Sequence, residues 1–178
     1  MGGFTIVELL VVIVVIGILA SISIVAYNGV QERARNAARV EEMQSWAKVF
    51  RLYKAEESRL PNVTSAWYCL GSGFPVGYGG VPRCRDYKVA GTGMNTDNIS
   101  YPESENAALM AALKTVADVP KSDKKPVLSQ HVGPYVDYNP TWGGNINQVF
   151  EGNECPEGTT TQWQPNTGVV ICSIAIMN

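Results

Sequence analysis

An unbroken apolar run near the N-terminus constrains this chain more than any other feature. From Phe4 to Tyr27 the sequence contains one charged side chain, Glu8, and no proline. A helix of these 24 residues would be about 36 Å long, whereas the hydrocarbon core of a bilayer is roughly 30 Å thick. The run therefore predicts a membrane-spanning helix that carries a carboxylate near one end.

Two other interpretations of this run compete with a functional membrane helix. A cleaved secretory signal would use Leu9–Leu19 as its apolar core and a small-residue cleavage site near Ala20. The apolar run, however, continues through Ile22 and Ile24, and no basic segment precedes it, which disfavours a cleaved signal. A plain single-pass anchor remains an alternative, and the role of Glu8 distinguishes it from a functional membrane helix.

After Tyr27 the pattern changes from apolar on all sides to amphipathic. Apolar residues recur at steps of three and four, while most charged residues fall between them. The apolar series is Val30, Ala34, Ala37, Ala38, Met43, Trp46, Ala47, Phe50 and Tyr53, and the intervening charged residues are Arg33, Arg35, Arg39, Glu42 and Arg51. The sequence thus predicts one helix of about fifty residues, ended by Leu60-Pro61-Asn62.

The remaining residues predict an α+β head. Residues 62–100 are rich in glycine, proline and serine and are expected to form a long loop. Residues 103–116 predict a short helix, with acidic residues at its start and Lys114 near its end, closed by Pro120. Short strands are expected at Val127–Val132, Tyr135–Tyr138, Ile146–Phe150, Thr160–Gln164 and Val169–Met177. These strands would form an antiparallel sheet on which the apolar stripe of the long helix packs.

The cysteines are even in number and widely spaced: Cys69, Cys84, Cys155 and Cys172. No C-x-x-C pair occurs and His131 is the one histidine, which disfavours a zinc site. Two disulfides in an extracytoplasmic head are therefore expected. Of the three pairings, spacing along the sequence favours Cys69–Cys84 and Cys155–Cys172, each contributing about 3 kcal/mol in the chain-entropy model.

The residues at the head of the apolar run resemble a known signature. Gly3-Phe4-Thr5-Ile6-Val7-Glu8-Leu9-Leu10, continuing as VVIVVIGILA, is similar to the start of type IV pilins and pseudopilins. In that family a prepilin peptidase cuts after the glycine, the new N-terminal phenylalanine is N-methylated, and a glutamate four residues further on is the lone charge. The resemblance covers roughly residues 3–35, including an aromatic at Tyr27. It implies cleavage between Gly3 and Phe4, methylation of Phe4, and the pilin glutamate role for Glu8.

The chemistry of this spacing is intelligible without the family. Cleavage would create an α-amine of pKa about 8 on Phe4, and methylation would leave that amine cationic. A carboxylate in an apolar helix is costly unless it is paired or functional. In the water-poor core of a filament, Glu8 of one copy could pair with the Phe4 amine of a neighbour and fix the axial register.

These observations lead to a functional expectation with defined boundaries. Residues 1–3 would be a leader remnant, 4–27 the transmembrane or filament-core half of the helix, 28–59 its amphipathic half, and 60–178 the disulfide-stapled head. The expected protein is a structural subunit of a type IV pilus, not an enzyme, without cofactor or metal, serving twitching motility, adhesion or DNA uptake. The alternatives are a pseudopilin of a type II secretion or competence apparatus and a single-pass membrane-anchored binding protein.

The resemblance also implies partners and a location. Identical copies would form a homopolymer after processing by the prepilin peptidase and extraction by the pilus assembly machinery of the inner membrane. The subunit would lie in the lipid of the cytoplasmic membrane before assembly and in an extracellular pilus afterwards, with its head outside the cytoplasm.

Two departures from the family pattern stand out. Val25 occupies a position where many members carry proline, and valine lacks the ring that kinks a helix there. Met1-Gly2-Gly3 contains no basic residue, whereas three arginines follow the helix, so the positive-inside rule alone would place the head in the cytoplasm. Because the cysteines favour an outside head, we expect a basic leader upstream of Met1 or an altered leader.

Several weaker signals have structural explanations as well as functional ones. Arg83, Arg85 and Lys88 lie near aromatic residues and could bind DNA or a surface, although a packed aromatic loop is the favoured explanation. His131 is expected to be a sheet residue. The triplets that begin at Asn62 and Asn98 have the form of glycosylation sequons. The acidic residues Glu151, Glu154 and Glu157 lack the order of a calcium loop.

Overall fold

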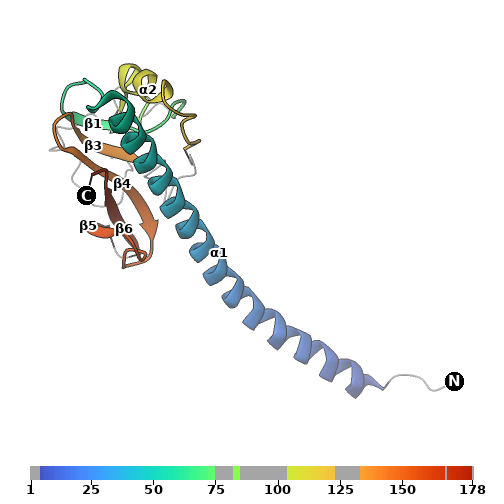
Figure 1. Cartoon of the computed structure of the whole chain (residues 1–178). Helices are drawn as coiled ribbons and strands as arrows, with labels where there is room; N and C mark the ends of the chain where they lie inside the picture. The colour runs from blue at the N-terminus through green and yellow to red at the C-terminus, as the bar shows by residue number, and fades with distance from the viewer. Residues whose placement is uncertain (1–4, 75–81, 85–103, 123–132, 167, 178) are drawn as a thin grey trace. The chain divides into compact units, whose positions relative to one another are not determined.

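The computed structural model describes residues 5–74, 82–84, 104–122, 133–166 and 168–177. The chain divides into two compact units, residues 1–35 and 36–178. Its helices and strands are drawn in Figure 1 and are α1 (Ile6–Glu57), β1 (Ala66–Cys69), β2 (Ser104–Glu105), α2 (Ala107–Lys114), β3 (Tyr135–Asn139), β4 (Gly143–Glu151), β5 (Thr160–Asn166) and β6 (Val169–Ala175). The expected α+β layout with a long N-terminal helix is confirmed.

The first helix, α1, is continuous over 52 residues, as the apolar run and the amphipathic pattern together predict. It ends at Glu57, three residues earlier than the predicted stop at Leu60. The residue after the helix, Ser58, has a φ of 58°. A left-handed residue directly after the last helical one breaks the series of main-chain hydrogen bonds. The helix therefore ends before Pro61, and Pro61 is not what terminates it.

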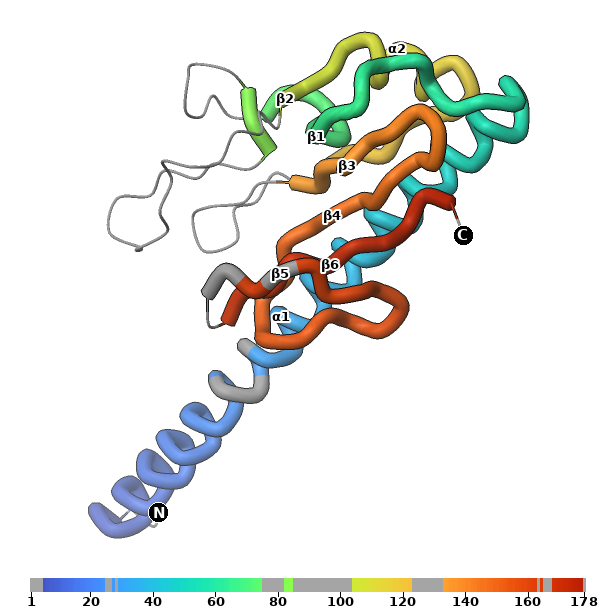
Figure 2. The backbone as a smooth tube through the Cα atoms, turned by 90° about the vertical axis from the view of Figure 1, so that its left-hand side faces the viewer, coloured from blue at the N-terminus to red at the C-terminus, as the bar shows by residue number. Residues whose placement is uncertain are grey.

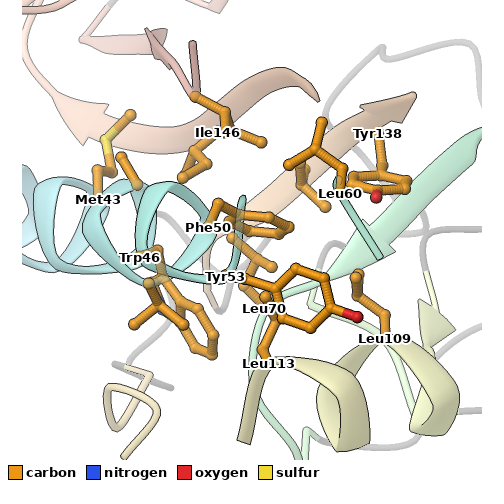
Figure 3. Close-up of a cluster of buried hydrophobic side chains, with 14 of the residues drawn as sticks. Met43, Trp46, Phe50, Tyr53, Leu60, Leu70, Leu109, Leu113, Tyr138 and Ile146 are labelled. Atoms are coloured by element: carbon orange, nitrogen blue, oxygen red, sulfur yellow. The ribbon is translucent and has the colours of Figure 1, made fainter. Parts of the chain in front are cut away.

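The core of the second unit is the apolar stripe of α1 packed on the sheet. Figure 3 shows Met43, Trp46 and Phe50 on the helix, in a cluster that includes Tyr138 and Ile146 of the strands. These five side chains have 1% or less of their surface exposed. The predicted stripe is correct from Met43 to Tyr53 but extends too far toward the N-terminus: Val30, Ala34, Ala37 and Ala38 are exposed.

Arg39, one of the charged residues that fall between the apolar positions of the helix, is not exposed. Its side chain is buried, with 3% of the residue exposed, and Glu42 is also buried. The guanidinium Nη1 lies 3.6 Å from Glu151 Oε1. A buried arginine next to a carboxylate is tolerated because the opposite charge offsets the lost hydration.

The six strands form one mixed sheet in the order β2-β1-β3-β4-β6-β5. Figure 2 shows β1, β3, β4 and β6 side by side. Four neighbouring pairs are antiparallel, but β1 and β2 are parallel, which corrects the expected all-antiparallel sheet. A long connection, residues 70–103, separates these two strands, and such a connection lets the chain return in the same direction.

The first strand lies within the segment that the sequence predicts to be a loop. Ala66–Cys69 pairs with β3, and the Trp67 ring stacks on Tyr135 at a centroid distance of 5.7 Å. Aromatic side chains that pack across neighbouring strands favour extended structure. The glycine and proline content of residues 62–100 predicts a loop, so the sequence pattern does not indicate this short strand.

The second helix is shorter at both ends than the predicted 103–116. Ser104 and Glu105 are in β2, and the helix starts after Asn106, whose Oδ1 accepts a hydrogen bond from the Leu109 amide at 2.8 Å. Asparagine at this cap position satisfies an amide that the first turn leaves unpaired. The helix ends at Lys114, so Pro120 does not close it.

The strands predicted around residues 135–138, 146–150, 160–164 and 169–177 are confirmed as β3, β4, β5 and β6. The strand predicted at Val127–Val132 lies outside the described residues. At the β3–β4 turn Gly144 has a φ of 96°, and a Cβ there would lie 1.7 Å from the Asp137 carbonyl oxygen. Glycine is therefore required where β4 begins.

A buried phenol generates a prediction about alkaline stability. The Tyr138 hydroxyl donates to the Pro61 carbonyl, and burial, aided by Tyr53 and Tyr68, raises the pKa of this phenol well above its usual range. An unfolded tyrosine titrates near pH 10. Above that pH the unfolded chain loses a proton that the folded chain retains, so stability should fall by about 1.4 kcal/mol per pH unit until the folded pKa is reached.

Tyr138→Phe should remove this alkaline loss while costing about 1–3 kcal/mol at neutral pH, because the Pro61 carbonyl loses its donor. Urea unfolding of both proteins in detergent between pH 7 and 11 provides the measurement. Parallel loss of stability in the two proteins above pH 10 would contradict the assignment.

Candidate functional site

The described part of the predicted site begins at Thr5, immediately before the first residue of α1. The Thr5 amide and hydroxyl both donate to Glu8 Oε2, each at 2.8 Å, and the Glu8 amide donates to Thr5 Oγ1 at 3.3 Å. This reciprocal arrangement is a capping box, in which two residues three apart satisfy each other's amides at a helix start. Gly3 and Phe4 lie outside the described residues.

The capping box adds Thr5 to the site that the sequence predicts. The signal is present in the sequence, because threonine followed three residues later by glutamate before an apolar run is typical of a helix start. Both bonds from Thr5 go to the Oε2 atom of Glu8. A carboxylate has further acceptor positions, so a second donor can bind Glu8 without displacing Thr5.

Beyond Glu8 the helix offers only apolar surface over several turns. Large apolar side chains from Ile6, which is 85% exposed, to Ile24, which is 62% exposed, are exposed on every side of the helix. α1 is long and apolar enough to cross a membrane, and no part of its most apolar stretch is buried. Water is a poor solvent for such a surface, so lipid or other apolar helices would suit it better. Tyr27, beyond this stretch, is exposed as well.

Two disulfides staple the second unit, with the pairing that sequence spacing favours. Cys69–Cys84 is fully buried beside Tyr135 and Val149 in a cluster separate from the one under α1. In Cys155–Cys172, Cys172 is buried in the cluster under α1 while Cys155 is partly exposed. The bridges therefore hold two different parts of the sheet.

The weaker candidates do not converge on a second site among the described residues. Trp67 and Tyr68 are partly buried in β1, Arg83 is partly buried, and Arg85, Lys88, Asn98 and His131 lie outside the described part of the chain. Asn62 is exposed directly after Pro61. Within residues 5–74, 82–84, 104–122, 133–166 and 168–177, no group of three or more His, Cys, Asp or Glu side chains could hold a metal ion.

The sequence matches no protein-family model and no curated protein, and the structure matches no solved structure. The resemblance described above therefore depends on the residues of the apolar helix themselves.

The capping box leads to a prediction for Thr5. Thr5→Val keeps the shape of the side chain but removes the hydroxyl that binds Glu8, so the first turn of α1 should fray at a cost of about 1 kcal/mol. Hydrogen exchange of the full chain in detergent, read by mass spectrometry, should show faster exchange in the first helical peptide. Thr5→Ser keeps the hydroxyl and should exchange like the wild type. Equal exchange in the valine and serine variants would contradict the capping role.

Proposed function

We propose that this protein is a structural subunit that polymerises into an extracellular filament of the type IV pilus kind. The observation that carries the proposal is the position of Glu8, a lone carboxylate in the first turn of a helix whose following turns are apolar and exposed. Such a residue is expected to be paired or functional once it leaves water. The resemblance of residues 3–35 to the pilin signature supports a function in assembly.

The first step of the proposed mechanism creates a positive charge next to Glu8. A prepilin peptidase cuts after Gly3, and the free amine of Phe4 stays cationic when it is methylated. Thr5, the capping residue of α1, then becomes the second residue of the mature chain. The new cation thus arises at the positive end of the helix dipole, which disfavours it unless a carboxylate lies nearby.

The second step uses that charge to fix subunits relative to one another. When the apolar helix exchanges lipid for neighbouring helices, the Phe4 amine of one copy pairs with Glu8 of the next. Thr5 holds one carboxylate oxygen of Glu8, and the remaining acceptor positions receive the amine. A charge pair in a water-poor environment is strongly dependent on geometry, so it defines one axial offset between copies. Repeating an offset that never closes gives a filament.

The remaining features fit this assembly. Disulfides persist in oxidising compartments, so the bridges at Cys84 and Cys172 favour a head outside the cytoplasm. A helix that enters the membrane before assembly and forms the filament core afterwards meets an apolar environment in both states. Membrane lipid, the peptidase, the inner-membrane assembly machinery and further copies of the chain are the partners that this route requires.

Processing can be tested at the residue before the cut. Gly3→Val should block cleavage, because the peptidase of the resembled family needs a small residue at this position. The expected result is unprocessed chain retained in the membrane, detected by its mass and by N-terminal sequencing. Mature filaments that begin at Phe4 in this variant would show that the cleavage site is wrong.

Two substitutions of Glu8 distinguish its proposed role in the charge pair from its role in the capping box. Glu8→Gln keeps an oxygen that can accept from Thr5 but removes the negative charge, since glutamine also serves in capping boxes. Glu8→Leu removes both. If the charge drives assembly, both variants should insert in the membrane and form disulfides normally, yet yield at least about tenfold less sheared filament than the wild type, the size of change expected for 1.4 kcal/mol in an equilibrium.

These variants must be expressed without a wild-type copy, and membrane-bound and sheared fractions must be measured in the same cells. Wild-type filament yield from Glu8→Gln with loss only in Glu8→Leu would assign the residue to helix capping and refute the charge pair. If both variants insert in the membrane like the wild type and none of the three proteins forms filaments, the alternative of a membrane-anchored binding protein is favoured.

A further inference from the structure

Within the second unit, α1 is held to the sheet by polar contacts at two separate places, which we call the first and second ties. In the first tie, Asn36 Nδ2 donates to the Glu151 carbonyl at 2.7 Å, and the Glu151 amide donates to Asn36 Oδ1 at 3.2 Å. In the second tie, Arg51 Nε donates to the Ile176 carbonyl at 2.8 Å and Nη2 to the Ala175 carbonyl at 3.2 Å. All four bonds join a helix side chain to the main chain of the sheet region.

The first tie is reinforced by the buried guanidinium described above. Arg39 Nη1 lies 3.6 Å from Glu151 Oε1 and donates to Asn36 Oδ1 at 3.4 Å. Displacing the helix would separate this nearly buried charge from the carboxylate that offsets its desolvation. The contact therefore adds a penalty against movement that an exposed ion pair would not.

The two ties lie at opposite ends of the same strand. Glu151 is the last residue of β4, whereas the Ile176 amide donates to the carbonyl of Gly144, near the start of β4, at 3.0 Å. From Asn36 to Arg51 the helix rises about 22 Å, and from Gly144 to Glu151 the strand extends about 23 Å. Figure 1 shows α1 running alongside β4 in this unit. The two ties therefore join α1 to the sheet at points that are separated by almost the full length of β4.

Polar ties and apolar packing respond differently to sliding. The burial of Met43, Trp46 and Phe50 depends on area and has no strong direction, so it tolerates small shifts along the helix axis. A hydrogen bond weakens steeply once its distance and angle depart from the usual range. A slide of one helical turn, about 5.4 Å, would break all four bonds together.

We propose that the two ties form a mechanical clamp that stops α1 from sliding along the sheet when the helix is pulled lengthwise. The proposal depends on the proposed function for the source of the pull, because a filament under tension would load each helix along its axis. The load would enter at the Asn36 end, and a force on the C-terminus would act beyond Ile176, at the Arg51 end. Helix and sheet are thus sheared, and both ties resist at once.

Single-molecule pulling of the full chain tests the clamp directly. Handles are placed at the two termini of the protein in detergent micelles, and the rate at which α1 detaches is measured at constant force. Asn36→Leu and Arg51→Met remove one tie each and keep similar side-chain volume. Each should detach about tenfold faster than the wild type, and the double variant about a hundredfold faster, since each hydrogen bond changes an equilibrium several-fold.

The matched control is Lys48→Met, which also removes a positive charge from α1. Lys48 is exposed and lies between the ties. Wild-type detachment of this control, together with fast detachment of the double variant, supports the clamp. Wild-type detachment of the double variant, or equal acceleration by Lys48→Met, overturns it. If the double variant does not fold, the detachment rates of the two single variants decide between these outcomes.

The outcome is independent of whether filaments form. The pulling experiment uses isolated chains, so a lack of filaments from the wild-type chain would remove the proposed source of load and leave the measured clamp unchanged. Conversely, detachment at the wild-type rate in every variant would refute the clamp without touching the filament proposal.

Discussion

Burial of the α1 stripe against the sheet is the interaction on which the head depends. Trp46 and Phe50 have no exposed surface, and the strand residues in their cluster come from β3, β4 and β6. Each large apolar side chain that is fully buried stabilises the fold by about 1.5–3 kcal/mol. Without the helix, this face of the sheet would be left in water. From Asn36 onward the helix is therefore part of the same compact unit as the sheet, whereas its earlier residues belong to the other unit.

The elements that the sequence predicts are those whose signal is local. The continuity of α1 and the existence of β3 to β6 follow from apolar periodicity, which needs no knowledge of partners. The two-residue strand β2 and the short strand β1 depend on pairing with each other and with β3, which a single pattern does not contain. The burial of Arg39 depends in the same way on Glu151, more than a hundred residues further along the chain.

The candidate site shows the same division between local and distant information. Isolation of Glu8 in an apolar run identifies it as a functional candidate, and its three-residue spacing from Thr5 is a local signal for the capping box. The cysteine pairing is predictable because the partners are close in sequence. A charge pair between copies, in contrast, is a property of an assembly, so one chain can supply the groups for it but not their geometry.

The boundary between the two compact units has a consequence for the release of the head. The division falls between Arg35 and Asn36, so both ties and the whole buried stripe belong to the C-terminal unit. A protease that cut α1 just before Asn36 would remove the apolar surface and leave every one of these contacts in place. We therefore expect residues 36–178 to keep the contacts of the second unit after such a cut, without the exposed apolar residues that precede them.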